Sequence, residues 1–402
     1  MKIALVCPAS LPATQFGGIV FLAIDIARKI SNVGHHVTIY TTDLDFSNGS
    51  DSFNKNLPRL EKINNFFINR THSYLSIKLF FINPGLYFQL KKDKPDIIHT
   101  IGLRSFQSFI AWKVSKENKI PLICTDQGGL TTHPFLIESG KFFEFIYKLQ
   151  NKFISKILKD SSVVCAANEY ERDIFYELNN NNNICIVRNG INLESLISAN
   201  NFKRKFQIDS NFMLFVGRFS KSKGIDILID AIYNLKEELT DLDFILVIMG
   251  VDFGFQKEML QKIEQYKINS LVKIIVNPSR EDVISSYNES EFLILPSRWE
   301  LSPLVPLESF AFKKPVISTD CHGIPYTVKN NENGILVKPE NSKDLGNAIV
   351  KLIKNKDLRE ELGRNGYNFV HNECNIDVMG EKYLSIYEKA ISDNENKYSI
   401  NN

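Results

Sequence analysis

The chain has 402 residues, of which 44% are hydrophobic and 23% are charged. This length exceeds the size at which a single core usually stops growing, so the sequence predicts two domains or more. The formal net charge of +2 is too small to indicate nucleic acid as a partner. The six cysteines are scattered without a C-x-x-C pair, which favours buried thiols in the cytoplasm over a disulfide framework or a zinc site.

The first half of the chain alternates short apolar runs with helical patterns. A strand at Ile3–Cys7 leads through a loop rich in Pro, Gly and Thr to a helix at Ile19–Val33, which ends at Gly34. Further strands are expected at Val37–Thr41, Asp96–Ile98, Pro121–Thr125, Val163–Ala166 and Ile184–Val187. Residues 47–69 are polar and irregular in pattern, and no element is predicted for them. The asparagine run at 179–183 predicts a surface loop. Strands alternating with helices predict a parallel sheet covered on both faces.

After Asn200 the alternation begins again, so two α/β domains are expected to meet near residues 190–205. The strands of this half are predicted at Met213–Val216, Phe244–Met249, Val272–Val276, Phe292–Leu295, Pro315–Ser318 and Gly334–Val337. The helices are predicted at Ile225–Glu238, Gln256–Tyr266, Arg280–Asn288 and Asp377–Ile391. A polar tail is expected after the last of these helices.

The segment Ser297–Phe312 combines a strand end, a loop and a helix start. Pro303 disfavours helix at the residue before it and is tolerated in a first turn, so Glu300 falls in the loop and Glu308 in the first turns of the helix. Such carboxylates at the carboxyl end of a parallel strand can accept hydrogen bonds from sugar or ribose hydroxyls. The first free N–H groups of the helix, from Leu304 onward, can meet a phosphate. Taken alone, the two acids could equally be a solvated loop residue and an ordinary helix residue.

A second motif joins the first strand of the second half to its first helix, at Phe215–Gly224. Gly217 permits close approach of a ligand, while Arg218 and Lys223 supply positive charge next to a helix N-terminus. A diphosphate fits these features. The order of a Walker loop is missing, and no G-x-G-x-x-G marks a dinucleotide site. Basic residues in a surface loop are, by themselves, more often simply solvated.

These two motifs belong to a similarity that extends over nearly the whole chain. The sequence resembles the nucleotide-sugar glycosyltransferases of family 4, which have the GT-B fold and retain anomeric configuration. The matching pieces are FGGI at Phe16–Ile19, GHHVTIYT at Gly34–Thr41, RNGIN at Arg188–Asn192, VGRFSKSKGIDILIDA at Val216–Ala231 and the segment from Glu300 to Glu308. The last two pieces are the most specific.

The resemblance implies an α/β architecture of two Rossmann-like domains that face each other across a cleft. The acceptor-binding domain is expected at residues 1–195 and the nucleotide-sugar-binding domain at 196–375. A helix at 376–392 is expected to pack back on the N-terminal domain, followed by the polar tail at 393–402. Closure of the two domains is expected to assemble the active site.

The resemblance also implies roles for individual residues. Arg218 and Lys223 would neutralise the donor diphosphate, Glu308 would hold the ribose hydroxyls, and Glu300 would lie beside the transferred sugar. Of these, Glu300, Arg218 and Lys223 are the expected catalytic residues. The remaining donor contacts are expected from small or helix-start positions, at Gly17, Gly18, Gly217, Ser302, Leu304 and Val305.

Two departures from the family pattern concern the sugar. Members commonly carry a Gly-Phe-Gly-like run after the first acid, whereas Leu301-Ser302-Pro303 stands here and removes one N–H donor. Relatives often place a histidine near the sugar at a strand end where this chain has Gln127, whose amide can still bond a hydroxyl. His133 is close in sequence and could substitute, although a histidine before proline is more often a loop residue. His99, directly after a strand, is expected to be structural.

The expected reaction moves a sugar from a nucleotide-sugar donor to a hydroxyl of a glycan or lipid-linked acceptor, as in cell-surface polysaccharide, lipopolysaccharide or glycolipid synthesis. Negative charge grows on the leaving diphosphate, so fixed cations stabilise the transition state. No acid cluster is placed to hold a metal there, and no cofactor or metal is expected. One alternative is a nucleotide-sugar epimerase of the same architecture, and another is a non-catalytic sugar-binding subunit.

The segment Lys141–Lys159 has the pattern of an amphipathic helix, and no apolar run approaches membrane-spanning length. Its five lysines fall within an arc of about 80° at 3.6 residues per turn. Its apolar residues are predicted on the other side, at Phe142, Ile146, Leu149, Phe153 and Ile157. This pattern suits peripheral binding to an anionic membrane surface at the inner face of the cell membrane. A core helix with a solvated lysine face is the alternative.

Overall fold

A computed structural model describes residues 1–45, 52–77, 80–128, 130, 140–179, 183–197 and 201–399. The chain divides into two compact units, the first formed by Met1–Asn189 with Ile376–Asn402 and the second by Gly190–Asn375. The sequence placed this boundary six residues later, at 195/196. Ile191 and Asn375, at the two ends of the second unit, form a parallel bridge, so the chain enters and leaves this unit side by side.

The first unit is built on an eight-stranded sheet whose order is β12-β11-β10-β9-β1-β2-β6-β5. All of its pairs are parallel except β5 with β6. Its strands are β1 Lys2–Val6, β2 His36–Thr42, β5 Leu60–Ile63, β6 Phe66–Thr71, β9 Ile97–Ile101, β10 Leu122–Thr125, β11 Val163–Ala166 and β12 Ile184–Ile186. Two short antiparallel pairs are formed by β3 Leu44–Asp45 with β4 Ser52–Phe53 and by β7 Leu75–Ile77 with β8 Phe80–Ile82.

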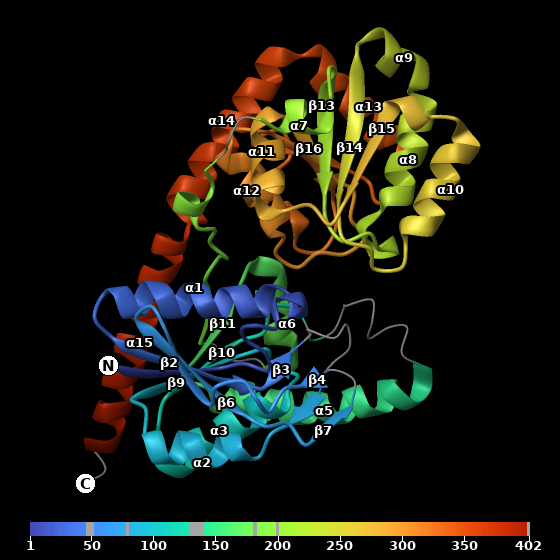
Figure 1. Ribbon diagram of the computed structural model, residues 1–402. Coiled ribbons are helices and arrows are strands. Elements are labelled where there is room, and N and C mark those ends of the chain that lie inside the picture. Colours follow the sequence, from blue (N-terminus) through green and yellow to red (C-terminus); the bar gives the residue numbers. More distant parts are fainter. Residues whose placement is uncertain are drawn as a thin grey trace. The chain divides into compact units, whose positions relative to one another are not determined.

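Helices cover both faces of this sheet, as its buried apolar strands require. One face is covered by α1 Gly18–Asn32 and α15 Ile376–Ser399, and the other by α2 Gly85–Asp93, α3 Phe106–Asn118, α5 Gly140–Asp160 and α6 Glu169–Asn179. Figure 1 shows α2, α3 and α5 together on one side of the blue and cyan strands. A short 3-10 turn, η1 Thr14–Phe16, precedes α1.

Helix α15 is part of the first unit although it comes from the far end of the chain. Its residues Met379, Tyr383 and Tyr387 are buried with those of α1 and the sheet. His99 on β9 is fully buried, with Nδ1 2.6 Å from the Tyr387 hydroxyl and Nε2 2.8 Å from Thr125 Oγ1. His99 is therefore structural, as expected. The helix also extends beyond residue 392, so most of the predicted polar tail is helical, and Asn394 donates to the Lys119 carbonyl at 2.9 Å.

We expect the buried His99 to make the first unit less stable in acid. Burial lowers the pKa of His99 from 6.5 to about 3. The unfolded chain therefore binds a proton that the folded chain excludes. The free energy of unfolding should fall as the pH drops from 6.5 towards 3, by up to about 1.4 kcal/mol per pH unit. Urea titrations at a series of pH values measure this slope, and His99→Gln should reduce it. An equal slope in both proteins would contradict the assignment.

The predicted apolar face of α5 is buried only in part. Ile157 is buried as predicted, together with Ile154 and Leu158, whereas Leu149 and Phe153 are 49% and 46% exposed. Arg104 donates to Gln150 Oε1 at 2.9 Å and to Asn151 Oδ1 at 2.8 Å, so these polar residues of α5 contact the rest of the unit. Leu149 and Phe153 consequently share the exposed surface with Lys148, Lys152, Lys156 and Lys159. Among the described residues, no helix is long and apolar enough to cross a bilayer.

The second unit has a parallel six-stranded sheet with the order β15-β14-β13-β16-β17-β18. Its strands are β13 Asn211–Val216, β14 Phe244–Gly250, β15 Val272–Val276, β16 Phe292–Leu295, β17 Val316–Thr319 and β18 Gly334–Val337. Two helical layers enclose it: α8 Ile225–Asn234, α9 Lys236–Asp241, α10 Gln256–Tyr266 and α13 Ser342–Lys354 on one face, and α7 Phe202–Phe206, α11 Arg280–Glu289, α12 Leu304–Ala311 and α14 Lys356–Glu373 on the other. Figure 1 shows α8 and α10 on the opposite side of the strands from α11 and α12.

The strands of this unit lie where the sequence predicted them, within a residue or two. The predicted helix Ile225–Glu238 is wrong as a single element, because Leu235 has φ −105° and ψ 9° and separates α8 from α9. No proline or glycine marks this break in the sequence. Short 3-10 turns complete the unit, at η2 Leu193–Ser195, η3 Lys221–Lys223, η4 Asn269–Leu271 and η5 Ile324–Tyr326.

Candidate active site

The strand order of the second unit locates a ligand site. From β13 the chain runs outward through β14 to β15, then returns to pair β16 with β13 on the other side. The order therefore reverses between β13 and β16. Parallel sheets of this type bind ligands beyond the carboxyl ends of the strands at such a point. The loop after β13 carries Gly217–Lys223 and the loop after β16 carries Ser297–Ser302, so both sequence motifs lie at the switch point.

The two loops meet through an ion pair. Lys223 Nζ donates to Glu300 Oε1, and Ser297 Oγ donates to the same carboxylate oxygen at 3.0 Å. The side chains of Lys223 and Glu300 are only 15% and 12% exposed. The attraction within a partly buried pair of this kind is screened less by solvent and salt than that within an exposed pair. The structure thus brings together the predicted phosphate-binding lysine and the predicted sugar-binding acid.

The backbones of the two loops also touch. Gly224 has φ +66°, and a Cβ atom built on it would lie 2.0 Å from the carbonyl oxygen of Pro296. Only glycine fits a left-handed position this close to another backbone. The close approach explains why a glycine follows Lys223, a point that the sequence alone did not reveal.

Arg218 is an exposed cation at the start of the loop after β13. It directly follows Gly217 at the end of β13, and its guanidinium lies 4.9 Å from the centroid of the Phe253 ring. Stacking on an aromatic face restricts the guanidinium while leaving its N–H donors accessible. Arg218 and Lys223 therefore give the loop one surface cation and one partly buried cation.

Helix α12 contributes the second acid and a helix N-terminus. It begins at Leu304, directly after Pro303, and no side chain caps it, so the N–H groups of Leu304 and Val305 head the helix. Ser302 lies in the loop just before this start and is partly buried. An uncapped helix start with a positive dipole end suits a phosphate.

Glu308 is held in place by α11. Its Oε1 accepts from Arg280 Nη2 at 2.6 Å and its Oε2 accepts from the Tyr287 hydroxyl at 2.9 Å. Burial, and then the Glu308 carboxylate, raise the pKa of Tyr287 well above its usual value, so this hydroxyl stays protonated and donates. Sequence reasoning used Arg280 only as a helix start and missed its contact with Glu308, because the two residues are far apart in the chain.

The remaining predicted residues belong to the first unit. Gly17 has φ +110° and Gly18 is the first residue of α1, and a Cβ atom on either would meet nothing within 4 Å. Their backbone is therefore open to a ligand. Their predicted role over the donor phosphates stays a prediction.

Gln127 is fixed by a reciprocal amide pair at the carboxyl ends of β10 and β12. Its Nε2 donates to Asn189 Oδ1 at 2.9 Å, and Asn189 Nδ2 donates back to Gln127 Oε1 at 2.8 Å. Its backbone N–H donates to Glu171 Oε1 at 3.1 Å. Burial, and then the Asp126 carboxylate, raise the pKa of Glu171 to about 8 against the opposing backbone hydrogen bonds. Contact of Gln127 with the sugar stays a prediction, and His133 lies outside the described residues.

Two family models match successive parts of the chain. The glycosyltransferase family 4 model matches residues 16–195, and the model of glycosyl transferases group 1 matches residues 197–369. The join between them falls within a few residues of the boundary between the two units.

Known proteins resemble the chain over most of its length. An uncharacterised glycosyltransferase of Methanocaldococcus jannaschii is 27% identical over 372 residues, which cover 92% of this chain and 94% of that protein. The UDP-Gal:alpha-D-GlcNAc-diphosphoundecaprenol alpha-1,3-galactosyltransferase of Escherichia coli is 27% identical over 312 residues, covering 75% and 78%. The structure of HepE from Anabaena in complex with UDP superposes with a TM-score of 0.76 at 18% identity, covering 97% of this chain and 100% of that one.

The chain is thus a glycosyltransferase enzyme with the GT-B fold. It belongs to the glycosyltransferases that carry a family 4 domain followed by a group 1 domain, which confirms the predicted family and fold class. The candidate residues Gly217, Arg218, Lys223, Glu300 and Glu308 all lie in the group 1 domain.

Proposed function

We propose that this enzyme transfers a sugar from a nucleotide-sugar donor to a hydroxyl of a glycan or lipid-linked acceptor, with retention of anomeric configuration. The observation that carries the proposal is the pairing of Lys223 with Glu300 at the switch point of the second unit. Arg218 and the uncapped start of α12 add positive potential, and Glu308 offers an oriented carboxylate. Cations for a diphosphate and acids for hydroxyl groups are what a nucleotide-sugar requires.

The proposed chemistry follows from where charge develops. As the bond between the anomeric carbon and the diphosphate lengthens, negative charge grows on the leaving phosphate and positive charge on the sugar ring. In this proposal Arg218, Lys223 and the N–H groups of Leu304 and Val305 stabilise the negative charge on the phosphate, and the Glu300 carboxylate stabilises the positive charge on the sugar ring. The two acids differ in role because Glu308 is bonded to Arg280 and Tyr287, whereas Glu300 is bonded to Lys223.

The relatives support a donor and an acceptor of this class. The name of the Escherichia coli enzyme includes a UDP-sugar donor and a diphosphoundecaprenol-linked acceptor, and HepE was solved with UDP. Another relative, from Staphylococcus aureus, is named as a capsular polysaccharide biosynthesis glycosyltransferase. We propose a role in cell-surface polysaccharide or lipopolysaccharide synthesis on this basis.

A thermal-shift panel of UDP, GDP, ADP and CDP tests the donor proposal. One nucleotide should raise the stability of the enzyme by about 2.7 kcal/mol at a hundredfold excess over its dissociation constant. Arg218→Ala and Glu308→Ala should lose the shift, while the exposed Glu258→Gln on α10 serves as the matched control in the same unit. A response to no nucleotide, or an equal response in all variants, would refute the proposal. NMR of the product from a labelled donor determines the anomer and tests retention.

Transfer is proposed to need no metal, because the site supplies its own fixed cations. Activity should persist at full rate after dialysis against EDTA and should not rise on addition of Mg²⁺ or Mn²⁺. Loss of activity with the chelator and recovery only with a divalent ion would overturn this part of the proposal.

The exposed face of α5 is proposed to bind an anionic membrane surface, where a lipid-linked acceptor would be located. Lys152 and Lys156 stand beside the half-exposed Leu149 and Phe153, and the neighbouring α3 exposes Lys113 and Lys116. Each lysine near an anionic surface contributes about 1 kcal/mol, and the apolar side chains add insertion at the headgroup boundary.

Sedimentation with vesicles tests the membrane proposal. The enzyme should bind vesicles of phosphatidylglycerol mixed with phosphatidylcholine, and it should bind pure phosphatidylcholine far less. The pair Lys152→Gln and Lys156→Gln should weaken binding by about tenfold or more. The pair Lys343→Gln and Lys351→Gln on α13 makes the same change of net charge and should have little effect. Equal weakening by both pairs would leave only a nonspecific charge effect and contradict the proposal.

A further inference from the structure

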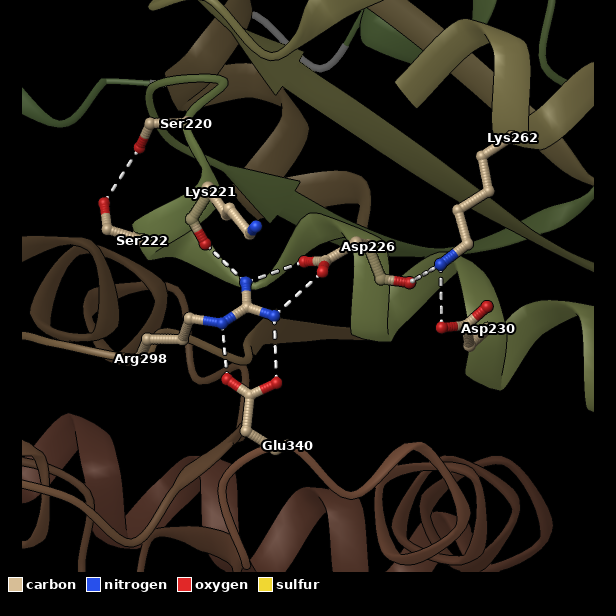
Figure 2. Close-up of polar contacts among 8 residues, drawn as sticks. All are labelled: Ser220, Lys221, Ser222, Asp226, Asp230, Lys262, Arg298 and Glu340. Atoms are coloured by element: carbon tan, nitrogen blue, oxygen red, sulfur yellow. Dashed lines mark hydrogen bonds and ion pairs between the residues drawn. The ribbon is translucent and has the colours of Figure 1, made fainter. Parts of the chain in front are cut away.

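Arg298 lies at the centre of a polar cluster beside the candidate active site, and the sequence assigned it no role. Its guanidinium faces two carboxylates at once, as Figure 2 shows. Nη1 and Nη2 donate to Asp226 at 2.7 and 2.8 Å, while Nε and Nη2 donate to Glu340, the latter at 2.9 Å. Two bidentate contacts use the planar fork that distinguishes arginine from lysine.

The same residue joins the two loops that carry the candidate active site. Its Nη1 also donates to the Lys221 carbonyl, and its backbone N–H donates to the Ser222 carbonyl at 2.8 Å. Lys221 and Ser222 belong to the turn that ends in Lys223, and Arg298 stands two residues before Glu300. Arg298 therefore connects the loop of the phosphate-binding lysine with the loop of the sugar-binding acid.

Neighbouring contacts make this connection rigid. The Ser220 and Ser222 hydroxyls are 2.9 Å apart, and Lys262 donates to Asp230 at 2.8 Å and to the Asp226 carbonyl at 3.2 Å (Figure 2). Burial alone would raise the pKa of Asp226, but the hydrogen bonds and charge of Arg298 outweigh it and hold this pKa below its usual range. Asp226 thus stays ionised and anchors the guanidinium to the first turn of α8.

We propose that Arg298 is a positioning residue that fixes Lys223 relative to Glu300 by clamping the loop after β13 to the loop after β16. The inference rests on the proposed function for the identity of the ligand, but the clamp itself is a property of the free enzyme. The conservative variant Arg298→Lys keeps the charge but loses both bidentate contacts, because a single ammonium nitrogen cannot replace the guanidinium fork, so it separates geometry from charge.

Trp299 reports the clamp without any ligand. The chain has two tryptophans, and Trp112→Phe leaves Trp299, next to Arg298, as the sole indole. In this background Arg298→Lys should increase acrylamide quenching of Trp299, because the loop after β16 moves more freely. Arg359→Lys is the matched control: Arg359 makes a similar set of bonds, to the Ile353 carbonyl at 2.8 Å and Glu291 at 3.0 Å, away from the two loops. Unchanged quenching in Arg298→Lys, or an equal rise in Arg359→Lys, would overturn the proposal.

A double-mutant cycle with the nucleotide probe tests the functional consequence. Calorimetry measures the affinity for UDP, GDP, ADP and CDP. For the nucleotide that binds, Arg298→Lys should lower the affinity by about tenfold. The same substitution should lower the affinity by less in a Lys223→Ala background, because Arg298 is proposed to act through Lys223. Additive losses would contradict positioning through Lys223. If quenching rises as expected while the parent enzyme binds none of the four nucleotides, the clamp stands and the donor proposal fails.

Discussion

Lys223→Ala is expected to lower kcat/KM for the nucleotide-sugar by about 10²- to 10³-fold, the usual cost of removing one preorganised charge from a developing anion. Lys223 is less exposed than Arg218 and Lys221, the other two cations of its loop, and pairs with Glu300. Its removal takes positive charge from the leaving phosphate. It also leaves the Glu300 carboxylate, which is 12% exposed, with the Ser297 hydroxyl at 3.0 Å but without its cation. The effect should therefore appear in both donor affinity and kcat.

Lys221→Ala is the matched control for this variant. Lys221 lies two residues earlier in the same turn, its side chain is exposed, and only its backbone carbonyl contacts Arg298. Initial rates at several donor concentrations separate kcat from KM for the two variants. Comparable losses in Lys221→Ala and Lys223→Ala would mean that general positive potential, and not the contact with Glu300, makes the lysine important.

Gly224→Ala is expected to destabilise the second unit by roughly 2–5 kcal/mol, the sum of a left-handed backbone penalty and an overpacked contact. The added Cβ would lie 2.0 Å from the Pro296 oxygen and 2.9 Å from its carbonyl carbon, and both are backbone atoms that cannot rotate away. The loops after β13 and β16 would have to separate. Nucleotide binding should be lost along with stability.

Alanine substitutions at two other glycines separate the backbone penalty of Gly224→Ala from the penalty of its close contact. Gly254 has φ +90° with no atom within 4 Å of a built Cβ, so Gly254→Ala should carry only the backbone penalty of about 1–2 kcal/mol. Gly18 has neither a positive φ nor a close neighbour, and Gly18→Ala should leave stability nearly unchanged. Urea unfolding measures all three as shifts of the midpoint. A Gly224→Ala midpoint equal to that of Gly254→Ala would show that the loops do not need their close approach.

Strand and helix positions could be predicted because each depends on a local pattern. The runs Met213–Val216 and Phe292–Leu295 are short, apolar and bounded by turn residues, which favours buried parallel strands. The polar end of the chain was harder, since polarity alone does not distinguish a loop from a solvated helix, and most of the asparagine run lies outside the described residues. Helix α15 is buried against the first unit through Met379, Tyr383, Tyr387 and Ala390, and it continues as a largely exposed helix to Ser399. The exposure of Leu149 and Phe153 on α5 was also not predicted, because it depends on contacts with other segments such as that of Arg104 with Gln150.

In the candidate site, too, some features could be predicted from the sequence and others could not. The placement of Arg218, Lys223, Glu300 and Glu308 was predictable, because a parallel strand followed by a loop and a helix brings particular positions to its carboxyl end. Their roles stay predictions. Their partners were not predictable. Arg280 and Arg298 are ordinary basic residues in the sequence, and only the folded chain places them against Glu308, Asp226 and Glu340.

The sequence by itself determined the α/β class, the two-domain organisation, the family and the residue types available to a nucleotide-sugar. These follow from periodicity and from motifs read within about ten residues, where chain connectivity alone sets the geometry. The tertiary structure decided which of those residues touch, which face of α5 is exposed, and why a glycine must follow Lys223. Those outcomes depend on contacts between residues more than forty positions apart, such as Arg104 with Gln150 and Lys223 with Glu300. The free energy of such contacts is gained only once the elements that carry them have come together.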